Sequence, residues 1–136
     1  MADFIYNTFK VFEGDGTIDM DDDDFYIMLL ADTYAPSAAH SLLAEVVAHE
    51  IAGAGYVAGG QLLTNVVWEN TAGVVKFDAD DPEWDPATLT ARYGLVYDFT
   101  PVSKPLAVLL DFGQNESATA APFRVQFNED GIFSKQ

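Results

Sequence analysis

Residues 88–127 constrain the fold of this 136-residue chain more than any other stretch, because apolar residues recur there at every second position. Three such runs follow one another, with the apolar members Leu89, Ala91, Tyr93, Leu95 and Tyr97, then Leu106, Val108, Leu110 and Phe112, then Phe123, Val125 and Phe127. A period of two places alternate side chains on one face of a pleated strand. We therefore predict three long strands in an antiparallel meander, with one face packed on a core.

The rest of the chain predicts shorter strands and one helix. Strands are expected at residues 4–12, 17–20, 25–31, 62–70 and 74–78. Leucines and valines recur at helical spacing from Leu42 to Val47, which predicts a short helix over residues 38–49. Glycines in residues 53–60 predict turns, and the acidic segment with two prolines at residues 78–86 predicts a loop.

Length and composition fit one folded domain. A chain of this size is ordinarily a single domain, and its hydrophobic residues, 49% of the sequence, are sufficient for a core. It has no cysteine, which excludes disulfides and thiolate chemistry. We therefore predict a single domain over residues 1–136 with an all-β fold, an antiparallel β-sandwich of jelly-roll or immunoglobulin-like type with one short helix.

Negative charge is the strongest compositional feature. Asp and Glu number 22 against 6 Lys and Arg, so the formal net charge is −16. Nucleic-acid binding requires cationic side chains facing phosphates, and anionic membranes also attract cations, so we expect neither as a partner. The chain begins without the basic and apolar regions of a signal peptide, which predicts synthesis and assembly in a cytoplasm.

Two acidic segments, residues 21–24 and 78–85, contain the oxygen ligands that Ca²⁺ prefers. Neither has the spacing of an EF-hand loop, because the sixth position counted from Asp78 is Glu83 and not glycine. We therefore expect exposed acidic loops and no metal site, with a calcium-binding module as an alternative.

No catalytic motif is present in the sequence. His40 and His49 lack the spacing of a zinc-binding His-Glu-x-x-His motif, and no serine stands in a glycine-flanked nucleophile elbow. We therefore expect no enzymatic activity, no catalytic residue and no cofactor. Trp84 lies in an acidic loop, where it would either pack on the sandwich or contact carbohydrate.

Turn glycines and strand residues form a recognisable series along nearly the whole chain. The segments are YNTFK at 6–10, YAP at 34–36, GAGY at 53–56, AGG at 58–60, FDADD at 77–81 with Trp84, ARY at 91–93, DFG at 111–113 and FNEDGI at 127–132. This series resembles a family of small virion structural proteins of tailed bacteriophages. Its members are head decoration or cement proteins, or tail and fibre components, and no catalytic residues belong to these motifs.

The resemblance implies a non-enzymatic virion protein. The expected role is a head decoration protein that binds the outer capsid surface and stabilises it. Its partners would be the major capsid protein and copies of itself in a homotrimer, on virions assembled in the host bacterial cytoplasm. The alternative is a tail, neck or fibre component that binds a neighbouring tail protein or a host surface glycan.

Exposed strands and flexible loops commonly add to a neighbouring protein, so they are the expected contact regions. The extended N-terminal segment supplies Ile5, Tyr6 and Phe9, and the glycine-rich passage supplies Tyr56. Trp84 is the fifth predicted contact residue, as the aromatic side chain of the acidic loop.

Overall fold

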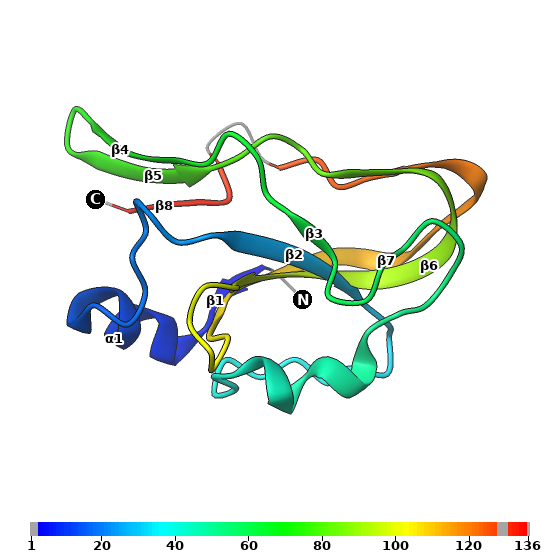
Figure 1. Ribbon diagram of the computed structural model, residues 1–136, viewed down its shortest axis with the longest axis horizontal. Coiled ribbons are helices and arrows are strands. Elements are labelled where there is room, and N and C mark those ends of the chain that lie inside the picture. The colour runs from blue at the N-terminus through cyan, green and yellow to red at the C-terminus, as the bar shows by residue number, and fades with distance from the viewer. Residues whose placement is uncertain (1–2, 128–130, 136) are drawn as a thin grey trace.

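The computed structural model describes residues 3–127 and 131–135. Its strands form two antiparallel sheets, drawn as two layers in Figure 1. The larger sheet has the order β1–β7–β6–β2–β3, with β1 (Phe4–Ile5), β7 (Leu106–Arg124), β6 (Glu83–Asp98), β2 (Phe25–Leu30) and β3 (Gln61–Leu62). The smaller sheet has the order β4–β5–β8, with β4 (Val67–Thr71), β5 (Val74–Asp78) and β8 (Phe133–Lys135). This mostly-β, two-sheet fold with one short α-helix confirms the predicted fold class.

The β6–β7 hairpin is the longest feature of the fold, with strands of 16 and 19 residues. Figure 1 shows both strands crossing the larger sheet, bending at one end of the molecule and returning above it beside the smaller sheet. The ladder between them is irregular between Ala91 and Tyr93, and Gly113 has a left-handed φ of 83° in the same region of β7. The hairpin therefore contributes to both layers.

The predicted three-strand meander is wrong in its strand count. The third apolar run, around Phe123, continues β7 after its bend, and β6 already begins at Glu83 within the predicted acidic loop. A bend restarts the alternation without ending the strand, because the backbone keeps its pairing with the neighbouring strand.

Aromatic and aliphatic side chains fill the space between the layers. Phe25 of β2 and Phe77 of β5 are both fully buried, and their ring centroids lie 5.0 Å apart. Phe133 of β8 lies 5.4 Å from Phe77 and 5.6 Å from Phe9. Edge-to-face and tilted contacts of this kind add to the free energy gained by apolar burial, and here they join both sheets to the N-terminal helix.

The N-terminal strand predicted over residues 4–12 is mostly a helix. Only β1 is extended, and α1 (Asn7–Asp15) follows it and ends at Gly16, whose φ is 88°. Residues 17–20, predicted as a strand, form part of a turn. The helix places Phe9 against the core, where its side chain is 1% exposed.

The helix predicted over residues 38–49 is replaced by two short 3-10 helices, η1 (Leu43–Glu45) and η2 (Val47–His49). Isolated backbone bridges hold the residues on either side of these helices extended, since Leu42 pairs with Pro105 and Glu50 pairs with Leu30. Between them the backbone leaves helical geometry at Val46, whose φ is −123°, so two 3-10 turns form in place of one α-helix.

The strand predicted over residues 62–70 is also divided. The structure has β3 at its beginning and β4 at its end, and these belong to different sheets. The chain crosses from one layer to the other between them, so the predicted continuous strand is wrong.

Close packing at Gly60 provides a test of the fold. Its φ is 85°, and a Cβ there would overlap the Ile27 carbonyl oxygen of β2, whereas Gly73 has a similar φ of 87° and open space around it. We expect Gly73→Ala to cost about 1 kcal/mol in unfolding free energy through backbone strain alone, and Gly60→Ala to cost about 3 kcal/mol or more. Urea unfolding of both variants measures the difference, and equal costs would contradict the described contact with β2.

Candidate functional site

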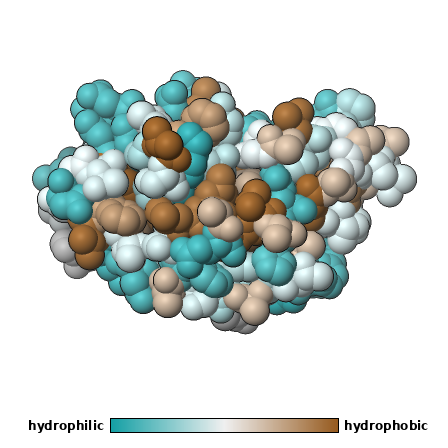
Figure 2. All heavy atoms as spheres, turned by 60° about the horizontal axis from the view of Figure 1, so that its bottom comes forward, coloured by the Kyte–Doolittle hydropathy of each residue, from teal (hydrophilic) through white to brown (hydrophobic). Residues whose placement is uncertain are grey.

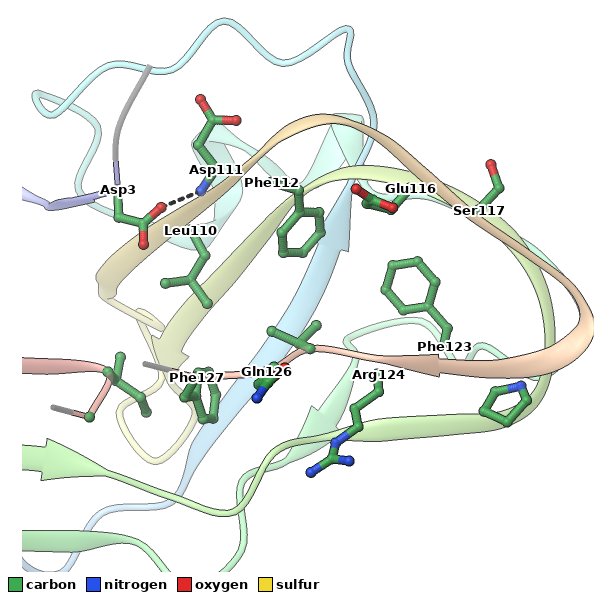
Figure 3. A pocket seen from close by; sticks show the side chains of 14 residues that line it. Asp3, Leu110, Asp111, Phe112, Glu116, Ser117, Phe123, Arg124, Gln126 and Phe127 are labelled. Atoms are coloured by element: carbon green, nitrogen blue, oxygen red, sulfur yellow. Dashed lines mark hydrogen bonds between the residues drawn. The ribbon is translucent and has the colours of Figure 1, made fainter. Parts of the chain in front are cut away.

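A groove with a cavity volume of about 410 Å³ lies between the outgoing and returning arms of β7. Figure 3 shows Leu110 and Phe112 on the outgoing arm and Phe123 on the returning arm, with their side chains directed into the space between the arms. The rings of Phe112 and Phe123 are 6.3 Å apart and form an apolar floor, which Val125 and Phe127 extend. We call this feature the β7 groove.

Acidic side chains dominate the rim of the β7 groove. Asp3, Asp111 and Glu116 line it, and Asp3 Oδ1 accepts a 2.7 Å hydrogen bond from the Asp111 N–H. The one cationic side chain on the lining, Arg124, lies 3.0 Å from Asp81 and is 60% exposed. The groove is therefore apolar inside and negatively charged at its rim.

The carboxylate of Asp111 is fixed in its charged form. Its burial alone would raise the pKa, but the Gly113 N–H at 2.8 Å and the Arg92 guanidinium at 3.1 Å hold the pKa of Asp111 below its ordinary value. A carboxylate with these partners is a positioned charge rather than a proton donor, and because its side chain is 0% exposed and paired with Arg92, the exposed acids of the rim are Asp3 and Glu116.

Within residues 3–127 and 131–135, the outer side of β7 has no neighbouring strand beyond its contact with β1. β1 pairs only with Val108 and Leu109, and the remaining described pairing of β7 is with β6 on its other side. Residues 113–117 are all exposed. We call residues 113–121 the β7 edge, where every second N–H and C=O points away from β6.

The structure brings Tyr56 and Trp84 together, with ring centroids 5.8 Å apart. The Tyr56 hydroxyl donates to Glu50 at 2.6 Å and accepts from the Leu29 N–H at 3.0 Å. Burial, followed by the bond to Glu50, raises the pKa of Tyr56 well above its ordinary value. The cluster ties the glycine-rich passage to β2, so its chemistry is that of a structural anchor.

Three of the five predicted contact residues are buried, which contradicts their prediction as exposed contacts. Tyr6 is 0%, Phe9 is 1% and Trp84 is 5% exposed, because each packs into the core of its own chain. Ile5 on β1 and Tyr56 are half-buried and also pack against this core. The predicted contact set therefore does not form one surface.

The sequence prediction placed residues 113–121 between its second and third strands, so it missed them both as strand and as a site. The overlooked signal was the loss of apolar residues on both alternating positions over residues 113–117. Such a stretch within a long strand indicates exposure of both faces, as at a sheet edge. The groove itself had no linear signal, since its apolar residues also fit the core-facing pattern.

A second polar cluster joins the N-terminus to residues 34–40. The hydroxyl groups of Tyr6 and Tyr34 lie 3.0 Å apart, and the Tyr34 hydroxyl lies 2.8 Å from His40 Nδ1. Burial raises the pKa of both tyrosines. These contacts satisfy buried hydroxyls and bring no nucleophile to the histidine, so they define a structural network.

Figure 2 shows the face that carries the elements at the bottom of Figure 1, where apolar side chains form a broken band between hydrophilic ones. Exposed large apolar residues of the chain are Val11, Val47, Val57, Leu62, Phe99 and Val102. They come from separate elements, and scattered apolar side chains are ordinary on protein surfaces.

Comparison of the chain with protein-family models, curated protein sequences and solved structures finds no match. The resemblance to phage virion proteins therefore stays a prediction. Within residues 3–127 and 131–135, no three His, Cys, Asp or Glu side chains gather closely enough to hold a metal ion. No helix in the same ranges is long and apolar enough to cross a membrane.

Asp98 is a buried acid at the end of β6, where it is 0% exposed. Burial, followed by the neighbouring Asp23 carboxyl, raises the pKa of Asp98 to about 8 from an ordinary 3.8. Its Oδ1 accepts from the Thr100 N–H at 3.1 Å, whereas its Oδ2 is buried without a hydrogen-bond partner among the described residues. The folded chain therefore keeps a proton on Asp98 where the unfolded chain has lost it, so folding takes up a proton between about pH 4 and pH 8.

The raised pKa of Asp98 predicts a pH-dependent stability. The folded state binds the proton that the unfolded state has lost, so stability falls as the pH rises through this window. Between pH 6 and pH 8 we expect the wild type to lose about 2 kcal/mol more unfolding free energy than Asp98→Asn, which can still accept the Thr100 hydrogen bond and does not titrate. Urea unfolding at both pH values measures this, with Asp22→Asn as an exposed control that should behave like the wild type.

The hydrogen bonds of the Tyr56 hydroxyl provide a separate test of stability. We expect Tyr56→Phe to lower the unfolding free energy by about 1–2 kcal/mol, because it leaves the Leu29 N–H and Glu50 without their shared partner. Tyr26→Phe is the control, since the structure describes no hydrogen bond of the Tyr26 hydroxyl within residues 3–127 and 131–135. Equal denaturation midpoints for the two variants would show that the Tyr56 anchor does not contribute.

Proposed function

We propose that this protein is a non-enzymatic structural protein of a tailed-phage particle, bound to the outer surface of the capsid as a decoration protein. The observation that carries the proposal is the β7 edge beside the β7 groove. A free strand edge next to an apolar groove binds other protein chains, through backbone hydrogen bonds and side-chain insertion. The order of motifs along the sequence supplies the virion context.

The net charge of the chain supports a position on the outer surface of the capsid. A formal net charge of −16 would be repelled by packaged DNA inside a head, whereas an outer surface imposes no such penalty. The same charge keeps free copies apart before assembly, because like-charged proteins repel one another.

The proposed mechanism is mechanical. Each copy contacts capsid subunits, and binding to the closed shell but not to its dissociated subunits stabilises the closed form by mass action. Copies arranged as a homotrimer around a local three-fold axis would match the symmetry of such a shell.

The tail alternative uses the same surface with a different neighbour. The β7 edge would then contact a tail or neck protein. The glycan form of this alternative has less support, because Trp84 is buried against Tyr56 and Phe123 and does not form part of an exposed aromatic face.

Copy number in purified particles tests the proposal. We expect the protein in purified virions of the phage that encodes it, at hundreds of regular positions on the shell, with heat resistance of the particles reduced when its gene is deleted. Cryo-electron microscopy and quantitative mass spectrometry measure these. A few copies in a ring or at the tail tip would favour the tail alternative. Particles without the protein would refute both forms.

A further inference from the structure

We propose that the β7 edge binds an extended, basic segment of another protein, which adds as a further strand beside residues 114–119 and places an apolar side chain in the β7 groove. The inference rests on the proposed function, since the segment would belong to a capsid subunit. It specifies the chemistry of that contact, which the proposed function leaves open.

Backbone geometry sets where the added strand pairs. Pairing with β6 is continuous at Glu116, Ser117 and Ala118, between the register shifts that flank it. Gly113 and Ala120 have left-handed φ values of 83° and 47°, which interrupt the extended backbone at either end. The regular stretch between them therefore offers an incoming strand a short ladder of alternating N–H and C=O groups.

The β7 edge lacks the protection that exposed edges usually carry. Natural edge strands are blocked by charges, prolines or covering segments. Residues 113–121 contain one charged side chain, Glu116, and Pro122 comes only after them. Among the described residues, the strand that pairs on this side of β7 is β1, further back at Val108 and Leu109, and the edge itself is contacted through its side chains by Asp32, which accepts a 3.0 Å hydrogen bond from Asn115. A strand edge that is open between β1 on one side and Pro122 on the other is the kind of edge with which another chain pairs.

The β7 groove provides specificity beside this ladder. Its apolar floor, formed by Leu110, Phe112 and Phe123, lies on the concave side of the strand, within reach of a side chain from the added strand. Its volume of about 410 Å³ lies at the lower end of the ~300–1,000 Å³ range of ligand sites. One or two apolar side chains of the partner are therefore the expected occupants.

Charge complementarity identifies a basic partner. Asp3 and Glu116 are exposed acids at the groove, whereas the buried Asp111 carboxylate is paired with Arg92 and the exposed Arg124 is paired with Asp81. A second copy of the chain would bring its own charge of −16 to this rim, so self-pairing is disfavoured. Lysine or arginine side chains alternating with apolar ones would match both the rim and the groove.

The experiment uses a blocked octapeptide of alternating valine and lysine as the probe. A twin peptide carries N-methyl groups on alternate amides, which removes hydrogen bonding along one edge and keeps the charge. Nuclear magnetic resonance of the ¹⁵N-labelled chain should show saturable shifts concentrated on residues 113–121, with slowed amide exchange there. The twin should bind at least about tenfold more weakly, because each lost backbone bond costs about 1 kcal/mol.

A matched pair of variants distinguishes electrostatic attraction of the peptide to the β7 edge from its attraction to the net charge of the whole chain. Glu116→Lys and Glu69→Lys each raise the net charge by two, but Glu69 lies on β4, away from the groove. We expect Glu116→Lys to weaken binding about fivefold and Glu69→Lys to change it less than about twofold. Equal effects of the two variants, equal binding of the two peptides, or no binding would each overturn the inference. None of these results would remove the protein from purified particles, so the proposed function is tested independently.

Discussion

The antiparallel ladder between β6 and β7 is the interaction on which the rest of the structure depends. It joins the longest strands of the chain and continues through the bend, so one hairpin belongs to both layers. β2 pairs with residues 93–98 of β6, and β1 pairs with Val108 and Leu109 of β7, while the smaller sheet packs above the larger one through Phe25 and Phe77. Losing the ladder would therefore divide the larger sheet and separate β1 from β2 and β3.

The same bend creates the candidate site. Folding β7 back over itself places Leu110 and Phe112 opposite Phe123, although these residues are more than ten positions apart in sequence. It also leaves the β7 edge without a described strand pairing on its outer side beyond Leu109. Groove and edge thus share one origin, which explains why an apolar surface lies next to unpaired backbone groups in a strongly acidic chain.

Buried polar groups connect loops to the larger sheet. Tyr56 shares its hydroxyl between Glu50 and the Leu29 backbone, and Asp98 Oδ1 accepts from the Thr100 N–H. These bonds fix the connections that follow β2 and β6. The acidic segment at residues 21–24, expected to be only an exposed turn, has a structural contact through Asp24, whose N–H donates to Thr100 Oγ1 and whose C=O accepts from the Phe99 N–H, both at 2.8 Å.

The sequence by itself determined the all-β class, the long alternating strands and the acidic surface, because a period of two and a charge excess are local properties of the chain. It could not determine the bend of the hairpin, which merges the second and third apolar runs into β7. It also could not show that Leu42 and Glu50 are held extended on either side of η1 and η2, or that Tyr6, Phe9 and Trp84 are buried. Tertiary structure decided these points, since backbone pairing and burial depend on partners that are distant in sequence. The candidate site also depends on tertiary structure, because its apolar residues come together only when β7 folds back over itself.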